Sequence, residues 1–180
     1  IWLNEAFATW MQYKTTAHFH PEWKSRTRER IYREDALALD PGKATRAVAD
    51  PPVHETGIFE VFDDITYQKG GAVLGMFEAQ IGEEVFRTGL RNYMAAHRYG
   101  NATADDLWYH LSRAAERDLT PAIGGWIHQR GFPLLKVTAE CQEGRTQVEL
   151  AQERYTSDGA KEASAMWLIP VVVHAGANTE

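Results

Sequence analysis

Apolar side chains recur at intervals of three or four residues over much of the chain, which is the spacing of amphipathic helices. Leu3, Phe7, Trp10 and Met11 form such a stripe over residues 3–16. The same period predicts helices over residues 22–39, from Asp63 or Asp64 to Ile81, over residues 83–97, after Thr103 and after Thr120. Residues 43–59 have no clear period and contain Asp50-Pro51-Pro52, so we expect a surface loop there.

Capping and helix-breaking residues place the ends of these helices. Thr103 and Asp106 have the spacing of a capping box, and the helix that follows is expected to bury Leu107, Trp108 and Leu111. The helix over residues 83–97 is expected to bury Phe86, Leu90, Tyr93 and Met94. Other starts and stops are predicted at Pro21, Asp40-Pro41-Gly42, Gly82, Tyr99-Gly100-Asn101, Thr120-Pro121, with Thr120 as the cap, and Gly131.

After Pro133 the apolar period becomes alternating, which predicts strands. The alternation runs through Leu135, Val137, Ala139 and Cys141 and resumes at Val148 and Leu150, with Glu143-Gly144-Arg145 as the turn, and a third strand-like run covers residues 167–173. A domain boundary is therefore expected near residues 131–133. About three strands cannot close a β-sandwich, and both ends of the chain look cut, so we expect a piece of a longer protein.

The composition is that of a globular protein, and its charge narrows the classes of partner. Of the 180 residues, 44% are hydrophobic and the formal net charge is −6, which argues against binding to nucleic acid or to an anionic membrane. The basic residues of 24–33 are interleaved with Glu22, Glu29, Glu34 and Asp35, as on a solvated helix face, and a partner site is the alternative. No apolar run approaches the ~18 residues that a membrane span needs. Cys141, the single cysteine, is expected to be a buried, inert thiol.

Three local motifs, in their order and separation, carry a resemblance to a known family. They are Trp2-Leu3-Asn4-Glu5-Ala6-Phe7-Ala8, Phe62-Asp63-Asp64-Ile65-Thr66-Tyr67-Gln68-Lys69-Gly70 and Tyr99-Gly100-Asn101-Ala102-Thr103. Together they resemble the M1 zinc aminopeptidases, which are gluzincins. The resemblance implies the helical C-terminal subdomain of a thermolysin-like metallopeptidase over residues 1–132. It also implies the beginning of a partial antiparallel β-sandwich domain over residues 133–180.

The resemblance assigns Glu5 as a zinc ligand. In that family the other two ligands are the histidines of an H-E-x-x-H helix, whose glutamate is the catalytic base, and this chain contains no such sequence. The G-x-M-E-N segment that reads the free amino terminus of the substrate is also absent. We therefore expect Zn2+ only together with the missing N-terminal half of the catalytic domain, and no activity from the 180 residues alone. The family motif has glycine where this chain has Ala6.

The resemblance assigns Tyr67 to stabilisation of the transition state. A phenol, with an ordinary pKa near 10, stays a hydrogen-bond donor at neutral pH and can face a developing oxyanion. The glycines that follow, Gly70 and Gly71, suit close packing near an active site. The residues that bind the peptide substrate are unknown.

Other interpretations stay open. Without the family context, Glu5 reads as an ordinary helix-surface acid and Tyr67 as a core aromatic. His18 and His20 invite a metal assignment with Glu5, although their spacing gives no common helix face. The rival function is a non-catalytic helical scaffold of metallopeptidase ancestry. An apolar face left by the missing half could also make the chain associate with itself.

Overall fold

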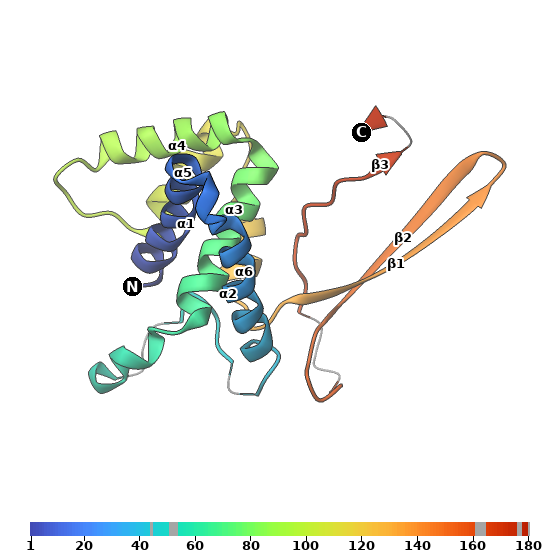
Figure 1. Ribbon diagram of the computed structural model, residues 1–180, viewed down its shortest axis with the longest axis horizontal. Coiled ribbons are helices and arrows are strands. Elements are labelled where there is room, and N and C mark those ends of the chain that lie inside the picture. Colours follow the sequence, from blue (N-terminus) through green and yellow to red (C-terminus); the bar gives the residue numbers. More distant parts are fainter. Residues whose placement is uncertain (44, 51–53, 161–164, 176–177, 180) are drawn as a thin grey trace.

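The computed structural model describes residues 1–43, 45–50, 54–160, 165–175 and 178–179, and it is mainly helical with a smaller antiparallel β part (Figure 1). This confirms the expected fold class. The described helices are α1 (Trp2–Phe19), α2 (Ser25–Leu39), α3 (Gly70–Ile81), α4 (Glu83–Ala96), α5 (Ala104–Ala114) and α6 (Thr120–Ile127), with the short helices η1 (Pro21–Trp23), η2 (Glu55–Val61) and η3 (Ile65–Lys69). The strands are β1 (Pro133–Gln142), β2 (Arg145–Arg154), β3 (His174–Ala175) and β4 (Asn178–Thr179).

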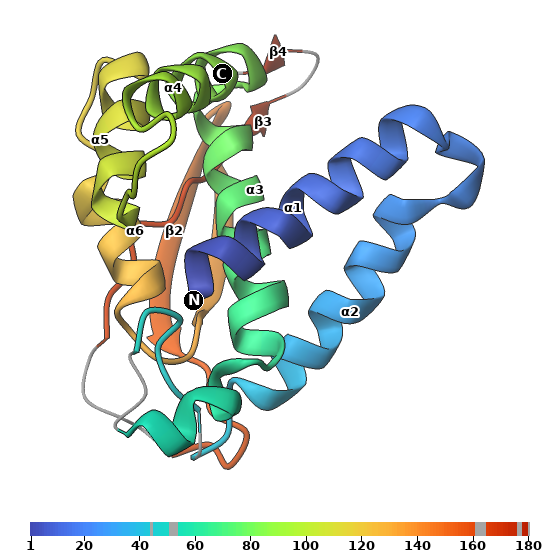
Figure 2. The ribbon, with the colours of Figure 1, turned by 90° about the vertical axis from the view of Figure 1, so that its left-hand side faces the viewer.

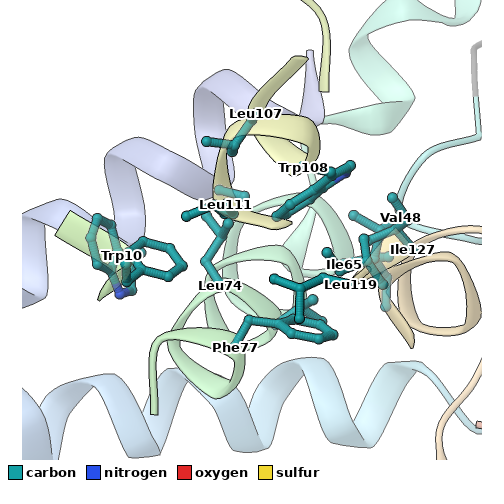
Figure 3. Packing of buried hydrophobic residues seen from close by; sticks show 14 residues of the cluster. Trp10, Val48, Ile65, Leu74, Phe77, Leu107, Trp108, Leu111, Leu119 and Ile127 are labelled. Carbon is teal, nitrogen blue, oxygen red and sulfur yellow. The ribbon is translucent and has the colours of Figure 1, made fainter. Parts of the chain in front are cut away.

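The core of the helical part is formed where α1, α3 and α5 meet (Figure 3). Leu74 and Phe77 of α3 and Leu107 and Leu111 of α5 are fully inaccessible to solvent. Burial of each such side chain stabilises the fold by about 1.5–3 kcal/mol. The prediction that Leu107, Trp108 and Leu111 are buried is confirmed.

Local capping chemistry fixes several helix ends. Thr103 and Asp106 form the predicted capping box, in which the Thr103 backbone N–H donates to the Asp106 carboxylate at 2.7 Å. Gly82, with φ of 89°, ends α3 as expected. The predicted cap at Thr120 is wrong by one position: Thr120 is the first residue of α6, and its N–H donates to Asp118 Oδ1 at 2.9 Å.

The predicted helix over residues 22–39 is interrupted. η1 is a short 3-10 turn, Lys24 adopts left-handed backbone angles, and only then does α2 begin at Ser25. The turn lets α2 fold back beside α1 (Figure 2), where the Ser25 hydroxyl donates to the Tyr13 carbonyl at 3.3 Å. The expected loop over residues 43–59 also contains part of η2, although residues 44 and 51–53 lie outside the described part of the chain.

The hairpin of β1 and β2 projects away from the helices (Figure 1). Its turn residues Glu143 and Gly144 both have positive φ, as a type I′ hairpin turn requires, and Val137 pairs with Leu150. Val137 is 58% and Leu150 46% exposed, because no described residue covers this face of the hairpin beyond its half-buried base at Leu135. For the same reason Cys141 is exposed, and the prediction of a buried thiol is wrong.

The run over residues 167–173 is not part of a ladder, so the predicted third strand there is wrong. Trp167 is instead buried beside Trp126 of α6, with ring centroids 6.4 Å apart. The side-chain amide of Gln152 holds the Trp167 backbone through two hydrogen bonds of 2.9 Å.

Met94, expected to be buried, is 64% exposed near the end of α4. Among the described helices, none is both long and apolar enough to cross a membrane.

Candidate active site

Glu5 lies in the first turn of α1, where its side chain is half-buried. A carboxylate is favoured there because the backbone N–H groups at the start of a helix carry a partial positive charge. The next residue, Ala6, is fully buried against α3. Glu5 is therefore fixed to the helical core through its neighbour while its own carboxylate stays at the edge of the core.

Tyr67 lies at the middle of η3, a five-residue π-helical turn that leads directly into α3. The Tyr67 backbone N–H donates to the Asp63 carbonyl at 3.0 Å. Of the two capping candidates, Asp63 makes the side-chain bond, because its Oδ1 accepts from the Thr66 N–H at 3.0 Å, whereas Asp64, directly before the turn, makes no side-chain capping bond. Single π-turns are uncommon and occur frequently at functional sites.

The structure packs α1, which carries Glu5, against η3, which carries Tyr67, although the two are far apart in the chain. Desolvation raises the pKa of the Tyr67 phenol above its ordinary value, and the nearby Glu5 carboxylate raises that pKa further. Tyr67 therefore stays protonated at neutral pH, in the state that can donate a hydrogen bond.

The segments that carry the two residues come together because α1 and the beginning of α3 cross with very little space between them. A Cβ atom on Gly70 would lie 2.7 Å from the Ala6 Cβ, which is closer than two carbon atoms can approach. A Cβ on Gly71 would lie 3.4 Å from the Ala6 carbonyl oxygen. The close packing expected of these two glycines is confirmed, and it sets the distance between the helix that carries Glu5 and the turn that carries Tyr67.

A buried ion pair holds the end of the turn. Lys69 Nζ lies 2.7 Å from Asp40 Oδ2 and donates to the Gly131 carbonyl at 2.8 Å, while the Gly131 N–H donates to Asp40 Oδ1 at 3.0 Å. Both side chains are more than nine-tenths buried. Desolvation lowers the pKa of Lys69, and the adjacent Asp40 carboxylate opposes that shift. Sequence reasoning missed this pair, because Asp40 reads as part of a helix-ending turn.

The histidines do not complete a metal site with Glu5. His18 is at the opposite end of α1, and a helix rise of about 1.5 Å per residue places it roughly 20 Å away. His20 instead bonds to Glu22 at 3.1 Å and stacks on Trp23. Among the described residues, no group of three or more His, Cys, Asp or Glu side chains is arranged to hold a metal ion. Glu5 is thus a single potential ligand in this part of the chain.

The third motif lies beside a surface pocket. This pocket, of about 1130 Å³, lies between α1 and α4, and its lining includes Asn4, Phe7, Tyr93 and the turn from Tyr99 to Ala102. Asn4 precedes Glu5 in the chain. The pocket thus reaches the first turn of α1, but neither Glu5 nor Tyr67 lines it.

Comparison with known proteins identifies relatives over nearly the whole chain. Residues 1–126 match the model of the peptidase family M1 domain. Aminopeptidase M1 of Arabidopsis thaliana is 34% identical over 98% of the chain, and Probable aminopeptidase 1 of Sulfurisphaera tokodaii is 39% identical over 87% of it. Tricorn protease-interacting factor F2 of Thermoplasma volcanium is 33% identical over 96%. The chain spans about a fifth of the length of these relatives, at 20%, 20% and 22%.

Proposed function

The chain belongs to peptidase family M1, and from this membership we propose that it is part of a zinc-dependent aminopeptidase that hydrolyses N-terminal peptide bonds. Glu5 is the zinc ligand and Tyr67 the residue that stabilises the transition state. The observation that carries the proposal is the packing of α1, which carries Glu5, against η3, which carries Tyr67. The two segments meet where Gly70 faces Ala6, although Glu5 and Tyr67 were nominated by different motifs.

Tyr67 acts as a hydrogen-bond donor. When the peptide carbonyl is attacked, negative charge develops on its oxygen, and a fixed phenol stabilises that charge more in the transition state than in the ground state. Its raised pKa keeps the proton on the phenol, so Tyr67 supplies a hydrogen bond without giving up its proton.

Zinc would supply an acidic water that attacks the peptide carbonyl near neutral pH. Of its ligands, the described residues offer one carboxylate, Glu5, and no cluster of three. The two histidines and the base of an H-E-x-x-H sequence must therefore come from the rest of a longer protein. We propose that the 180 residues alone hold zinc weakly and do not turn over substrate, because one carboxylate does not replace a three-ligand site.

The test compares the whole protein with the 180-residue chain. Zinc content is measured by elemental analysis, and turnover with an aminoacyl chromogenic substrate. The proposal expects about one zinc and turnover in the whole protein only. Glu5→Gln should lower its zinc content, whereas Glu34→Gln, on the exposed face of α2, should not. A whole protein with neither zinc nor turnover would favour the non-catalytic scaffold.

Tyr67→Phe tests the role of the phenol. In the whole protein we expect a loss of about 100-fold or more in kcat, since that is the usual effect of removing one such donor, with the fold and the zinc content unchanged. Tyr109→Phe, on the exposed face of α5, is the matched control and should keep full activity. Near-wild-type turnover in Tyr67→Phe would remove this residue from the mechanism.

A further inference from the structure

Arg46 holds the beginning of the turn that carries Tyr67. Its guanidinium binds both oxygens of the Asp63 carboxylate, with Nη2 at 2.6 Å from Oδ1 and Nε at 3.3 Å from Oδ2. Nη2 also donates to the Thr66 hydroxyl at 2.6 Å. Three backbone carbonyls, those of Ala47, Val48 and Val61, accept further bonds from the same group at 3.0–3.4 Å. One side chain thus ties two loop segments to the residues just before Tyr67.

These contacts act on the backbone of Tyr67. The Asp63 oxygen that binds Arg46 also accepts the Thr66 N–H, and the Asp63 carbonyl accepts the Tyr67 N–H at 3.0 Å. The Arg46 side chain is 19% exposed and Thr66 is 1% exposed, while the Asp63 side chain is 35% exposed. The five N–H donors of a planar guanidinium can serve the six acceptors when one N–H of Nη2 is shared between two of them, and a lysine, with three donors, cannot.

We propose that Arg46 is a positioning residue for Tyr67: through Asp63 and Thr66 it fixes the geometry of the π-turn that carries the Tyr67 phenol. This inference rests on the proposed function of Tyr67. Asp63 and Thr66 stand at the beginning of this turn, so its shape depends on what holds them. Without Arg46, the Asp63 cap loses its partner and the turn is free to relax toward an ordinary α-helical turn.

The first experiment reads the position of Tyr67 in the 180-residue chain. The seven tyrosines are replaced by 3-fluorotyrosine, and the Tyr67 fluorine resonance is identified by its loss in Tyr67→Phe. We expect Arg46→Ala to shift or broaden that resonance and to leave the others in place. The matched control is Arg26→Ala, which removes an arginine that is paired with Glu29 at 3.1 Å on the surface of α2. An unchanged Tyr67 resonance in Arg46→Ala overturns the inference.

The second experiment measures turnover in the whole protein. Because a misplacement of about 1 Å can reduce the rate about 100-fold, we expect Arg46→Ala to lower kcat by about 10- to 100-fold with KM changed by less than about twofold. If Arg46 acts through Tyr67, the double variant Arg46→Ala/Tyr67→Phe is no slower than Tyr67→Phe alone. Independent, multiplicative losses overturn the inference.

The two experiments also separate this inference from the proposed function. A whole protein without turnover refutes the proposed function, while the fluorine spectrum of the 180-residue chain still decides whether Arg46 places Tyr67. If Arg46→Ala does not fold, Thr66→Val removes the guanidinium contact nearest to Tyr67 and is read in the same way. Arg46→Lys keeps the charge but not the bidentate geometry, and is expected to restore less than half of the lost kcat.

Discussion

Substitution of Gly70 by alanine tests the close crossing of α1 and α3. In an open helix position, alanine is more favourable than glycine by about 1 kcal/mol. At Gly70, however, the new methyl group would lie 2.7 Å from the Ala6 Cβ, and neither atom belongs to a flexible side chain. Overpacking of this kind destabilises a core by about 1–3 kcal/mol. We therefore expect Gly70→Ala to reduce the free energy of unfolding by up to about 2 kcal/mol.

The control for helix propensity is Gly124→Ala. Gly124 lies inside α6, and a Cβ there would meet nothing within 4 Å. This variant should be more stable than the wild type by as much as about 1 kcal/mol. Thermal unfolding followed by circular dichroism distinguishes the two variants, because a change of 1 kcal/mol shifts the Tm of a chain of this size by about 2–4 °C.

The double variant Ala6→Gly/Gly70→Ala moves the methyl group from α1 to α3. Ala6→Gly alone should destabilise by about 2 kcal/mol, from the lost helix propensity and one buried methyl group. Together the changes in propensity cancel and the contact is restored, so the double variant should unfold within about 1 kcal/mol of the wild type. If Gly70→Ala is as stable as Gly124→Ala, or if the double variant shows additive losses, the two helices do not meet at these residues.

Two further predictions concern charges. Lys69→Met leaves the Asp40 carboxylate buried without its partner, so denaturant unfolding should show that the free energy of unfolding falls by about 3–5 kcal/mol. The double variant Lys69→Met/Asp40→Leu should recover most of this loss. The control is Lys136→Met, at the exposed pair with Glu153, which should change the free energy of unfolding by less than about 1 kcal/mol. Hydrogen bonds from Thr103 hold the pKa of Asp106 below its ordinary value. Between the two pKa values the unfolded chain therefore binds more protons than the folded chain. The stability that this cap supplies is lost as the pH falls from about 4 through the lowered pKa. Unfolding curves at pH 2–6 should therefore depend less on pH in Asp106→Asn, and an identical pH dependence would contradict the assignment.

The parts of the fold that could be predicted from the sequence are those encoded by neighbouring residues. The capping box of Thr103 and Asp106 and the buried stripe of α5 depend on spacings of three and four, which one helix fixes by itself. The break at Lys24 could not be predicted in this way. Its left-handed backbone has no glycine to mark it, and it is stabilised by the return of α2 along α1.

In the exposed hairpin, the local prediction of strands is right, but the predicted burial of one face is wrong. The alternation from Leu135 to Cys141 correctly predicts a strand, and Val137 pairs with Leu150 as the pattern requires. Alternation also implies that one face is covered, but beyond the half-buried Leu135 no described residue covers this face. Burial of Cys141 depends on what lies across the sheet, which a strand pattern does not specify.

The candidate site combines both kinds of information. The motifs nominate Glu5 and Tyr67, but no spacing along the chain predicts that the segments carrying them pack together. That packing involves Gly70 facing Ala6, and the turn that carries Tyr67 is held by Arg46 before η3 and by Lys69 at its end. From the sequence alone, Arg46 is a cation in a loop and Lys69 is a cation in a helix. Their partners Asp63 and Asp40 are brought to them by the fold. A π-turn fixed at both ends by ion pairs holds its central side chain in one place, so the loss of either ion pair should disturb Tyr67 while the core around Leu74 stays packed.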